Sequence, residues 1–245
     1  MNKTVITTKL RPHEIDLSDA EVKNWFDNSK LTQTDIILQQ INEERLYDPI
    51  LAQKENLVIL DIGANVGLFS LYAQDSAKKI VAVEPTPRTF AMLNKLTQGV
   101  DKITPVAAAL SAQDGDIDFF VTDNPTINSL LDKSIDINYD SGQSVTVKGK
   151  TIKTILDEQE LDWVDFVKCD IEGGEVLALT VDTVTAVKGR IGSWFVEVHQ
   201  TNRDQSAWPG NLESNRLKLI EIFKQSGYDA VPLINDQIFA WVNDE

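Results

Sequence analysis

The chain has 245 residues, of which 42% are hydrophobic and 25% charged, and its formal net charge is −15. This composition is typical of a globular domain with a large core, and it lacks the Lys and Arg clusters that bind nucleic acid, so neither DNA nor RNA is expected as a direct partner. No apolar run approaches the roughly 20 residues that a membrane helix needs, so a membrane is not expected as a partner either.

Two features bear on the compartment. The N-terminal residues lack the apolar segment of a signal peptide. The single cysteine, Cys169, excludes an intramolecular disulfide and favours a reducing environment. A cytoplasmic location is therefore expected.

Residues 1–50 differ from the rest of the chain and show no clear pattern for a buried strand. Ser18 with Glu21 three residues later matches a capping box, and apolar residues recur near helical spacing over 32–46. We expect an N-terminal helical arm or cap over 1–50, packed on a main domain over 51–245.

From Asn56 onward, apolar segments of strand length alternate with segments of helical spacing. Strands are expected at 57–61, 78–85, 103–110, 162–170, 192–200, 229–235 and 237–243, and helices at 66–74, 87–98, 153–159, 174–187 and 211–227. Residues 114–124 are expected to form a hairpin, as are the last two strands. This order predicts an α/β fold, a Rossmann-like doubly wound, mostly parallel seven-stranded sheet with an antiparallel C-terminal hairpin and an N-terminal helical extension.

Gly63 and Gly67 flank the point where the first of these strands becomes a helix. In open α/β sheets, ligands bind outside the carboxyl ends of the strands. Glycine leaves room for a ligand to approach the backbone, and the free N–H groups of the following helix point to the same place. The alternative is a tight turn with close packing of helix against strand.

The spacing differs from that of a dinucleotide site. Counted from Gly63, the second and third glycines of G-x-G-x-x-G are replaced by Asn65 and Leu68. Glu84 ends the second strand, where an acidic residue accepts hydrogen bonds from a ribose diol. The pattern predicts a site for a nucleoside without a pyrophosphate, in which Asp61 suits a cationic amine.

This combination resembles the class I S-adenosylmethionine-dependent methyltransferases. Three further blocks resemble the FkbM family within them, namely "VEPTPRTFAML" at 83–93, "FVKCDIEGGEVLAL" at 166–179 and "FVEVH" at 195–199. Together with the glycine turn they cover residues 56 to about 200, in the order of that family. The resemblance implies S-adenosyl-L-methionine as cofactor and a small molecule or glycan as the acceptor. Cys169 stands where the family usually has an apolar residue.

The chemistry is expected at the carboxyl ends of two later strands, which carry Asp170, Glu172, Glu197 and His199. Alternation along a strand places Glu197 and His199 on the same side. His199 is predicted as the general base, because its ordinary pKa lies near 6.5, although a structural role is equally open. Asp170 is predicted to orient substrate or cofactor, and Glu172 to position the acceptor and to replace His199 if that residue is not the base.

The residues predicted to bind the cofactor are Asp61, Gly63, Asn65, Gly67, Glu84, Ser111 and Asp170. Thr86 and Arg88 are expected near the ribose or adenine, and Trp208 lies in a polar loop that could cover the acceptor. Lys168 is interpreted as a strand residue without a catalytic role. Asp170 and Glu172 could instead hold a metal or accept N–H groups at a helix start, and no metal ligand is assigned.

The predicted function is methylation of a hydroxyl oxygen of a sugar, glycan or secondary metabolite. One alternative is an NAD-linked Rossmann oxidoreductase, and another is a non-catalytic nucleoside-binding or scaffold protein. The sequence does not indicate the oligomeric state.

Overall fold

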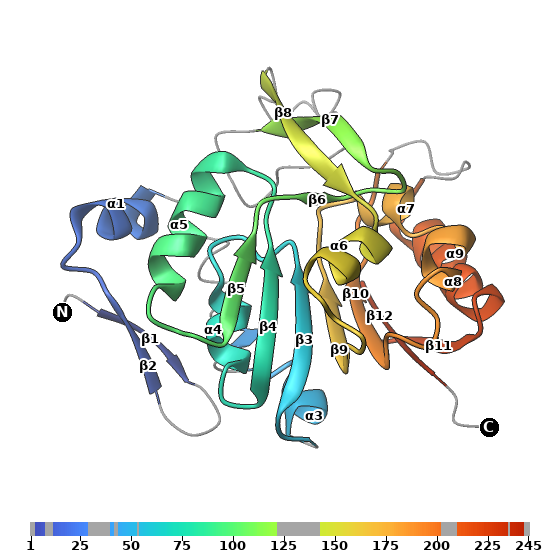
Figure 1. Ribbon diagram of the computed structural model, residues 1–245, viewed down its shortest axis with the longest axis horizontal. Coiled ribbons are helices and arrows are strands. Elements are labelled where there is room, and N and C mark those ends of the chain that lie inside the picture. The colour runs from blue at the N-terminus through green and yellow to red at the C-terminus, as the bar shows by residue number, and fades with distance from the viewer. Residues whose placement is uncertain are drawn as a thin grey trace.

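A computed structural model describes residues 3–7, 12–28, 40–41, 44–52, 54–121, 143–201, 210–234 and 236–242. Within these residues the main sheet has seven strands in the order β11-β12-β10-β9-β3-β4-β5 (Figure 1). The strands are β3 (Leu57–Ile62), β4 (Ala77–Val83), β5 (Ile103–Val106), β9 (Phe166–Cys169), β10 (Ser193–Glu197), β11 (Tyr228–Pro232) and β12 (Gln237–Val242).

The pairing of the strands confirms the predicted fold class. β3 runs parallel to both β4 and β9, and the parallel pairs β4–β5 and β9–β10 extend the sheet on either side. β12 runs antiparallel to β10 and β11, which gives the expected C-terminal hairpin. From β3 the chain first adds β4 and β5 on one side of the sheet and later adds β9 and β10 on the other side. The boundary between β3 and β9 is therefore the switch point, and a ligand is expected in the crevice at the carboxyl ends of these two strands.

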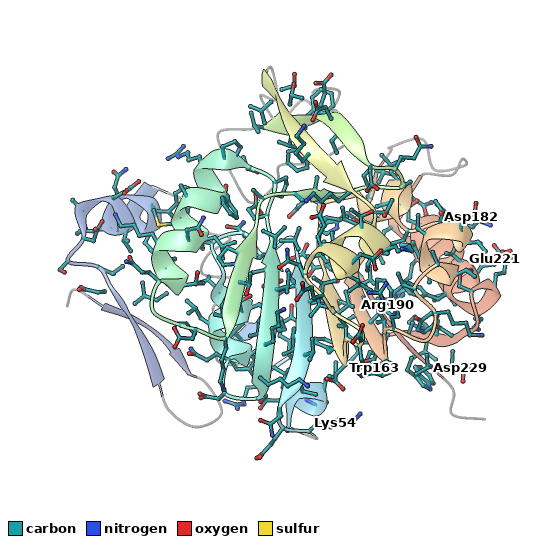
Figure 2. All side chains as sticks on the ribbon, viewed as in Figure 1. Lys54, Trp163, Asp182, Arg190, Glu221 and Asp229 are labelled. Carbon is teal, nitrogen blue, oxygen red and sulfur yellow. The ribbon has the colours of Figure 1, made fainter. Side chains whose placement is uncertain are left out.

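Side chains alternate between the two faces of the sheet, and each face has its own core. One face packs against α6 (Ile152–Glu158), α7 (Glu175–Ala178), α8 (Val181–Thr185) and α9 (Leu212–Gln225). The other packs against α1 (Ala20–Asn28), α3 (Asp48–Leu51), α4 (Leu68–Ala73) and α5 (Pro87–Thr97). Charged side chains such as Asp182 and Glu221 lie on the outside of this arrangement (Figure 2).

Helix starts follow from local sequence. The Thr151 side chain accepts the Thr154 N–H at the start of α6, and the Asn211 side chain accepts the Ser214 N–H at the start of α9. α5 begins with Pro87, whose missing N–H costs nothing in the first turn. These caps place the helices as the sequence predicts.

The prediction of a single helix over 174–187 is wrong, because this segment forms two separate helices, α7 and α8. Leu179 has an extended backbone with φ −90° and ψ 95°, which ends α7. Thr180 then starts α8 with a capping box, in which its side chain accepts the Thr183 N–H and the Thr183 side chain accepts the Thr180 N–H. A capping threonine in mid-segment therefore outweighs the apolar periodicity.

Two further expectations are corrected by a second sheet, which lies beyond the carboxyl ends of the main strands (Figure 1). The strand expected over 103–110 divides into β5 and β6 (Ala109–Leu110), of which β6 joins the second sheet. Residues 114–124 do not form a hairpin, since β7 (Gly115–Val121) pairs antiparallel with β8 (Gln143–Lys150). β8 was not predicted, and residues 122–142 lie outside the described part.

The N-terminal region is not wholly helical. β1 (Lys3–Thr7) and β2 (Pro12–Asp16) form an antiparallel hairpin before α1. The cap of α1 is Asp19 rather than Ser18, because the Asp19 side chain accepts the N–H groups of Glu21 and Val22. Most of the segment 32–46 is outside the described residues.

Buried aromatic contacts join this region to the main sheet. The ring of Tyr47 meets Phe69 of α4 and Phe195 of β10 at centroid distances of 4.6 and 5.1 Å. The division at residue 50 remains a prediction. Within the described ranges, no helix is long and apolar enough to span a membrane.

Candidate active site

The glycine turn between β3 and α4 is shaped by two close approaches. Gly63 has φ 75°, and a Cβ there would lie 1.8 Å from the carbonyl oxygen of Asp170. Gly67 has φ 87°, and its Cβ would lie 2.6 Å from Leu93 of α5. Gly63 therefore permits the turns after β3 and β9 to touch, and Gly67 permits α5 to pack closely against the turn after β3, which supports the interpretation as a tight packing turn. Their contact with a cofactor remains a prediction.

Glu84 follows β4 directly and is 6% exposed. Its Oε2 accepts the Asn65 N–H at 3.2 Å, and its Oε1 accepts the Thr86 N–H at 2.9 Å. Burial raises the pKa of Glu84 to about 7, although both backbone donors favour its charged form. The carboxylate is thus fixed beside the glycine turn, and its remaining lone pairs can accept ribose hydroxyls.

Lys168 occupies the centre of the site, a position that the sequence analysis did not assign to it. Its Nζ donates to the Gly63 carbonyl oxygen at 3.1 Å and lies 3.2 Å from Asp170 Oδ2 and 3.7 Å from Asp61 Oδ1. Burial alone would lower the pKa of Lys168, but Asp170 and Asp61 outweigh it and raise the pKa. The signal was present in the sequence, since residues two apart on a strand, such as Lys168 and Asp170, share a face.

Asp61, at the end of β3, is fully buried. Its Oδ2 accepts the Ser70 hydroxyl at 2.7 Å, whereas its Oδ1 has no hydrogen-bond partner among the described residues. Burial raises the pKa of Asp61, and Lys168 partly offsets this. A buried carboxylate oxygen that can accept another donor fits the predicted contact with a cationic amine.

Glu175 is a further site residue that was not predicted. It is fully buried at the start of α7, where its Oε2 accepts the Gly173 N–H at 2.9 Å. Its Oε1 accepts the backbone N–H of His199 at 2.7 Å and lies 3.3 Å from His199 Nδ1. Glu175 therefore fixes both the backbone and the ring of His199.

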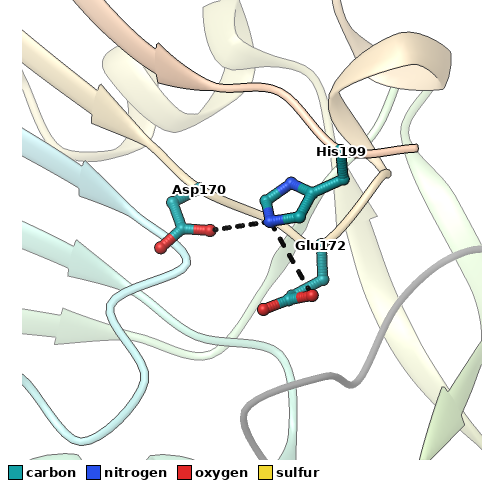
Figure 3. A group of neighbouring side chains, drawn as sticks. All are labelled: Asp170, Glu172 and His199. Carbon is teal, nitrogen blue, oxygen red and sulfur yellow. Dashed lines mark ion pairs between the residues drawn. The ribbon is translucent and has the colours of Figure 1, made fainter. Parts of the chain in front are cut away.

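Three carboxylates face the other ring nitrogen of His199. Nε2 lies 3.8 Å from Asp170 Oδ1, 3.8 Å from Glu172 Oε2 and 4.0 Å from Glu197 Oε1. Figure 3 shows Asp170 and Glu172 pointing toward the imidazole from the turn after β9. Glu197 and His199 thus lie near each other, as their spacing predicts.

Burial alone would lower the pKa of His199, but the hydrogen bond that its ring donates to Glu175 and the charges of Glu175, Glu172 and Asp170 raise it to about 10. The ring is then protonated at neutral pH and has no lone pair to accept a proton, which opposes its predicted role as general base in the absence of ligands. The charge of Asp170, together with burial, raises the pKa of Glu197 to about 8. The identity of the base remains a prediction, with Glu172 as the alternative.

Other predicted residues lie apart from this group. Ser111 follows β6 and donates its N–H to the Lys150 carbonyl oxygen at 2.9 Å. No hydrogen bond or ion pair between described residues joins it to Glu84 or the glycine turn. Arg88 lies over the ring of Trp25, 5.1 Å from its centroid. Trp208 lies outside the described residues.

A doubly wound sheet with a glycine turn after β3 and a buried carboxylate after β4 is the arrangement of a class I methyltransferase. The chain belongs to the FkbM methyltransferase family, whose domain matches residues 61–230. The resemblance inferred from the sequence is thereby confirmed, and the alternative of an NAD-linked oxidoreductase loses its support.

Individual proteins resemble this chain in sequence or in fold. The chain is 26% identical to methyltransferase sdnD of Sordaria araneosa over 194 residues, which is 67% of this chain and 74% of that protein. Its fold resembles a fibrillarin pre-rRNA processing protein of Methanococcus jannaschii, with a TM-score of 0.52, 13% identity and coverage of 99% and 84% of the two chains. It also resembles an S-adenosylmethionine-dependent methyltransferase from Aquifex aeolicus, with a TM-score of 0.51, 14% identity and coverage of 89% and 100%.

S-adenosylmethionine is accordingly the cofactor of this chain, as the sequence predicts. The residues present fit it. Glu84 presents a fixed carboxylate for the ribose, and the buried Oδ1 of Asp61 can accept a donor from the methionine amine.

Proposed function

We propose that this methyltransferase transfers the methyl group to a hydroxyl oxygen of a sugar, glycan or secondary metabolite. The observation that carries the proposal is the cluster of Asp170, Glu172, Glu197 and His199 at the carboxyl ends of β9 and β10. A hydroxyl group must lose its proton when it is methylated, and a cluster of carboxylates with an imidazole supplies groups that can accept it.

The cofactor half of the site is built around Glu84 and Lys168. Glu84 would hold the ribose diol, while Lys168 keeps the glycine turn and Asp170 together through its contacts with both. When bound, S-adenosylmethionine supplies an electrophilic methyl group on a sulfonium. Asp61 and Asp170 place negative charge near this cation.

The acceptor half would lie toward His199. The acceptor hydroxyl would lose its proton to Glu172 as its oxygen forms the new bond to the methyl group, and His199 could take the proton only after losing its own. The cofactor would supply the methyl group and retain on its sulfur the electron pair of the bond that breaks. Holding the two reactants in line can supply roughly 7–11 kcal/mol of the acceleration, and the base about 10²–10⁴-fold.

The second sheet carries a pocket that suits a polar ligand. A pocket of about 410 Å³ lies beside the second sheet and is lined by Ser111, Ala112, Gln113, Asp114, Gly115, Asp116, Ile117 and Leu177. Leu177 is an exposed residue of α7, so the pocket lies between the second sheet and the outer side of that helix. Its volume lies in the range of small-ligand sites, and its amide and carboxylate groups suit hydroxyl-rich ligands. The net charge of −15 argues against a polyanionic acceptor.

The compartment forms part of the same proposal. Cys169 is a buried free thiol and the only cysteine of the chain, which supports a reducing, cytoplasmic setting.

The test is turnover with S-adenosylmethionine that carries a ¹³C-labelled methyl group, against a panel of sugars, glycans and hydroxylated metabolites. The proposal expects an acceptor to gain one methyl group whose carbon resonance is that of a methyl ether. Glu84→Gln should lower turnover at limiting cofactor concentration by weakening cofactor binding, whereas His199→Ala should spare cofactor binding and slow transfer. A methyl group found on nitrogen or carbon would contradict the proposal, and cofactor binding without any turnover would favour the non-catalytic alternative.

A further inference from the structure

Asp170, Glu172 and His199 come from two segments of the chain and direct one ligand atom each at a common point (Figure 3). His199 Nε2 lies 3.8 Å from a carboxylate oxygen of each acid, and the three atoms all lie within 4.8 Å of one another. Separations of 3.8 Å are too long for hydrogen bonds. They are short enough for two ligand atoms to share one ion at roughly 2.1 Å from each, since two such bonds span up to about 4.2 Å.

The imidazole is already oriented as in a metal-binding histidine. Its Nδ1 faces the buried carboxylate of Glu175 at 3.3 Å, which leaves Nε2 directed at Asp170 and Glu172. Glu175 is itself held by the N–H groups of Gly173 and His199. Histidines that bind metals almost always have such a carboxylate or carbonyl on the second ring nitrogen.

The negative charge around this point also favours binding of a cation. Four carboxylates, those of Asp170, Glu172, Glu175 and Glu197, surround the single imidazole, all within 4.0 Å of one of its nitrogen atoms. Lys168 contacts Asp170 from the side of β9. The carboxylates here outnumber the cationic groups of Lys168 and His199, and partly buried carboxylates are stable when they are paired or coordinate a metal.

We infer that Asp170, Glu172 and His199 form a binding site for a divalent cation. One imidazole and two carboxylates match Mn²⁺ best, because imidazole suits transition metals and carboxylate suits hard cations. The sequence suggested a metal only for the acidic pair, and the structure adds His199 and its orienting partner Glu175. The role of the cation rests on the proposed function: beside the acceptor, it would favour loss of the hydroxyl proton as a Lewis acid. Its binding does not depend on that function.

The experiment titrates Mn²⁺ into the chelator-treated full chain and follows free Mn²⁺ by electron paramagnetic resonance, without cofactor or acceptor. We expect the wild-type chain to bind one Mn²⁺. His199→Ala and Glu172→Gln should each weaken binding at least tenfold, and Glu175→Gln by about 10–100-fold, the usual effect of losing an orienting partner. Glu221→Gln, which changes an exposed carboxylate on α9, should bind as the wild type does. Circular dichroism checks that each variant is folded.

Absence of Mn²⁺ binding by the wild type overturns the inference. So does binding that persists unchanged in both His199→Ala and Glu172→Gln, because the ion would then lie elsewhere. A chain that binds Mn²⁺ through these residues but methylates no hydroxyl would support the cation site and contradict the proposed function. A chain that binds no Mn²⁺ and methylates a hydroxyl at full rate after chelation would contradict the cation site and support the proposed function.

Discussion

Replacing Gly63 by alanine is expected to damage both the fold and the site. The new Cβ would lie 1.8 Å from the carbonyl oxygen of Asp170 and 3.0 Å from the Ile171 side chain, with φ at 75°. A left-handed conformation costs a non-glycine residue about 1–2 kcal/mol, and overpacking a dense region costs about 1–3 kcal/mol more. Because the clash is with backbone, the turn that carries Asp170 must move. We expect a loss of about 2–5 kcal/mol in the free energy of unfolding.

Gly99 provides the matched control. Its φ is 83°, close to that of Gly63, but a Cβ there would meet nothing within 4 Å. Gly99→Ala should therefore cost only the backbone term, about 1–2 kcal/mol. Urea unfolding of the wild type and both variants measures the difference, which we expect to be about 1–3 kcal/mol. Equal losses in the two variants would refute the close packing of the turns after β3 and β9.

Three other predictions concern single residues. Glu84 has a folded-state pKa of about 7 against an ordinary value of 4.5, so the stability that its neutral form contributes is complete below pH about 4.5 and is lost as the pH rises through about 7. Over this window the free energy of unfolding of the wild type should fall by about 3 kcal/mol relative to that of Glu84→Gln. Parallel pH dependences of the two proteins in urea unfolding would contradict the prediction. Lys168→Met removes the ammonium group beside Asp61 and should lower the free energy of unfolding by about 3–5 kcal/mol at neutral pH. Part of this loss should be regained at acid pH, where Asp61 takes up a proton. A loss of no more than about 0.5 kcal/mol in urea unfolding, as for an ordinary surface change, would disprove the pairing. Thr180→Ala removes the cap of α8 and should lower the free energy of unfolding by about 1 kcal/mol. The control is Thr185→Ala, at the exposed end of the same helix. Equal stability of the two variants would show that the cap does not stabilise the helix.

The order of strands and helices was predictable because it depends on local periodicity. The segments over β3, β4, β9 and β10 are apolar on both sides, which is typical of strands covered by helices on both faces. The parts of the fold that were not predicted depend on distant pairing. β8 pairs antiparallel with β7 and parallel with β6, both of which lie far from it in the sequence. The pattern of 114–124 taken alone favoured a hairpin instead.

The sequence predicted those site residues that follow directly from the type of residue at the end of a strand. Asp61, Glu84, Asp170 and His199 all lie at the carboxyl ends of strands, as expected. Lys168 was set aside because a lysine within an apolar strand gives no sign of the two carboxylates that it meets from neighbouring turns.

Two properties of His199 could not be read from the sequence. Its orientation and its raised pKa both depend on Glu175, which reaches it from another segment. For Ser111 the strand expected before it divides, and its second part, β6, joins the second sheet. The contact of Ser111 with the cofactor stays a prediction.

The most direct test of the account is calorimetric titration of S-adenosylmethionine into wild type and Glu84→Gln, with the exposed Glu158→Gln as control. Loss of charge-assisted hydrogen bonds to the ribose should cost about 1.5–3 kcal/mol, so the dissociation constant of Glu84→Gln should rise at least about tenfold, while Glu158→Gln should match the wild type. A wild-type chain that does not bind the cofactor, or a Glu84→Gln chain that binds it equally well, would contradict a cofactor site held by the carboxylate after β4.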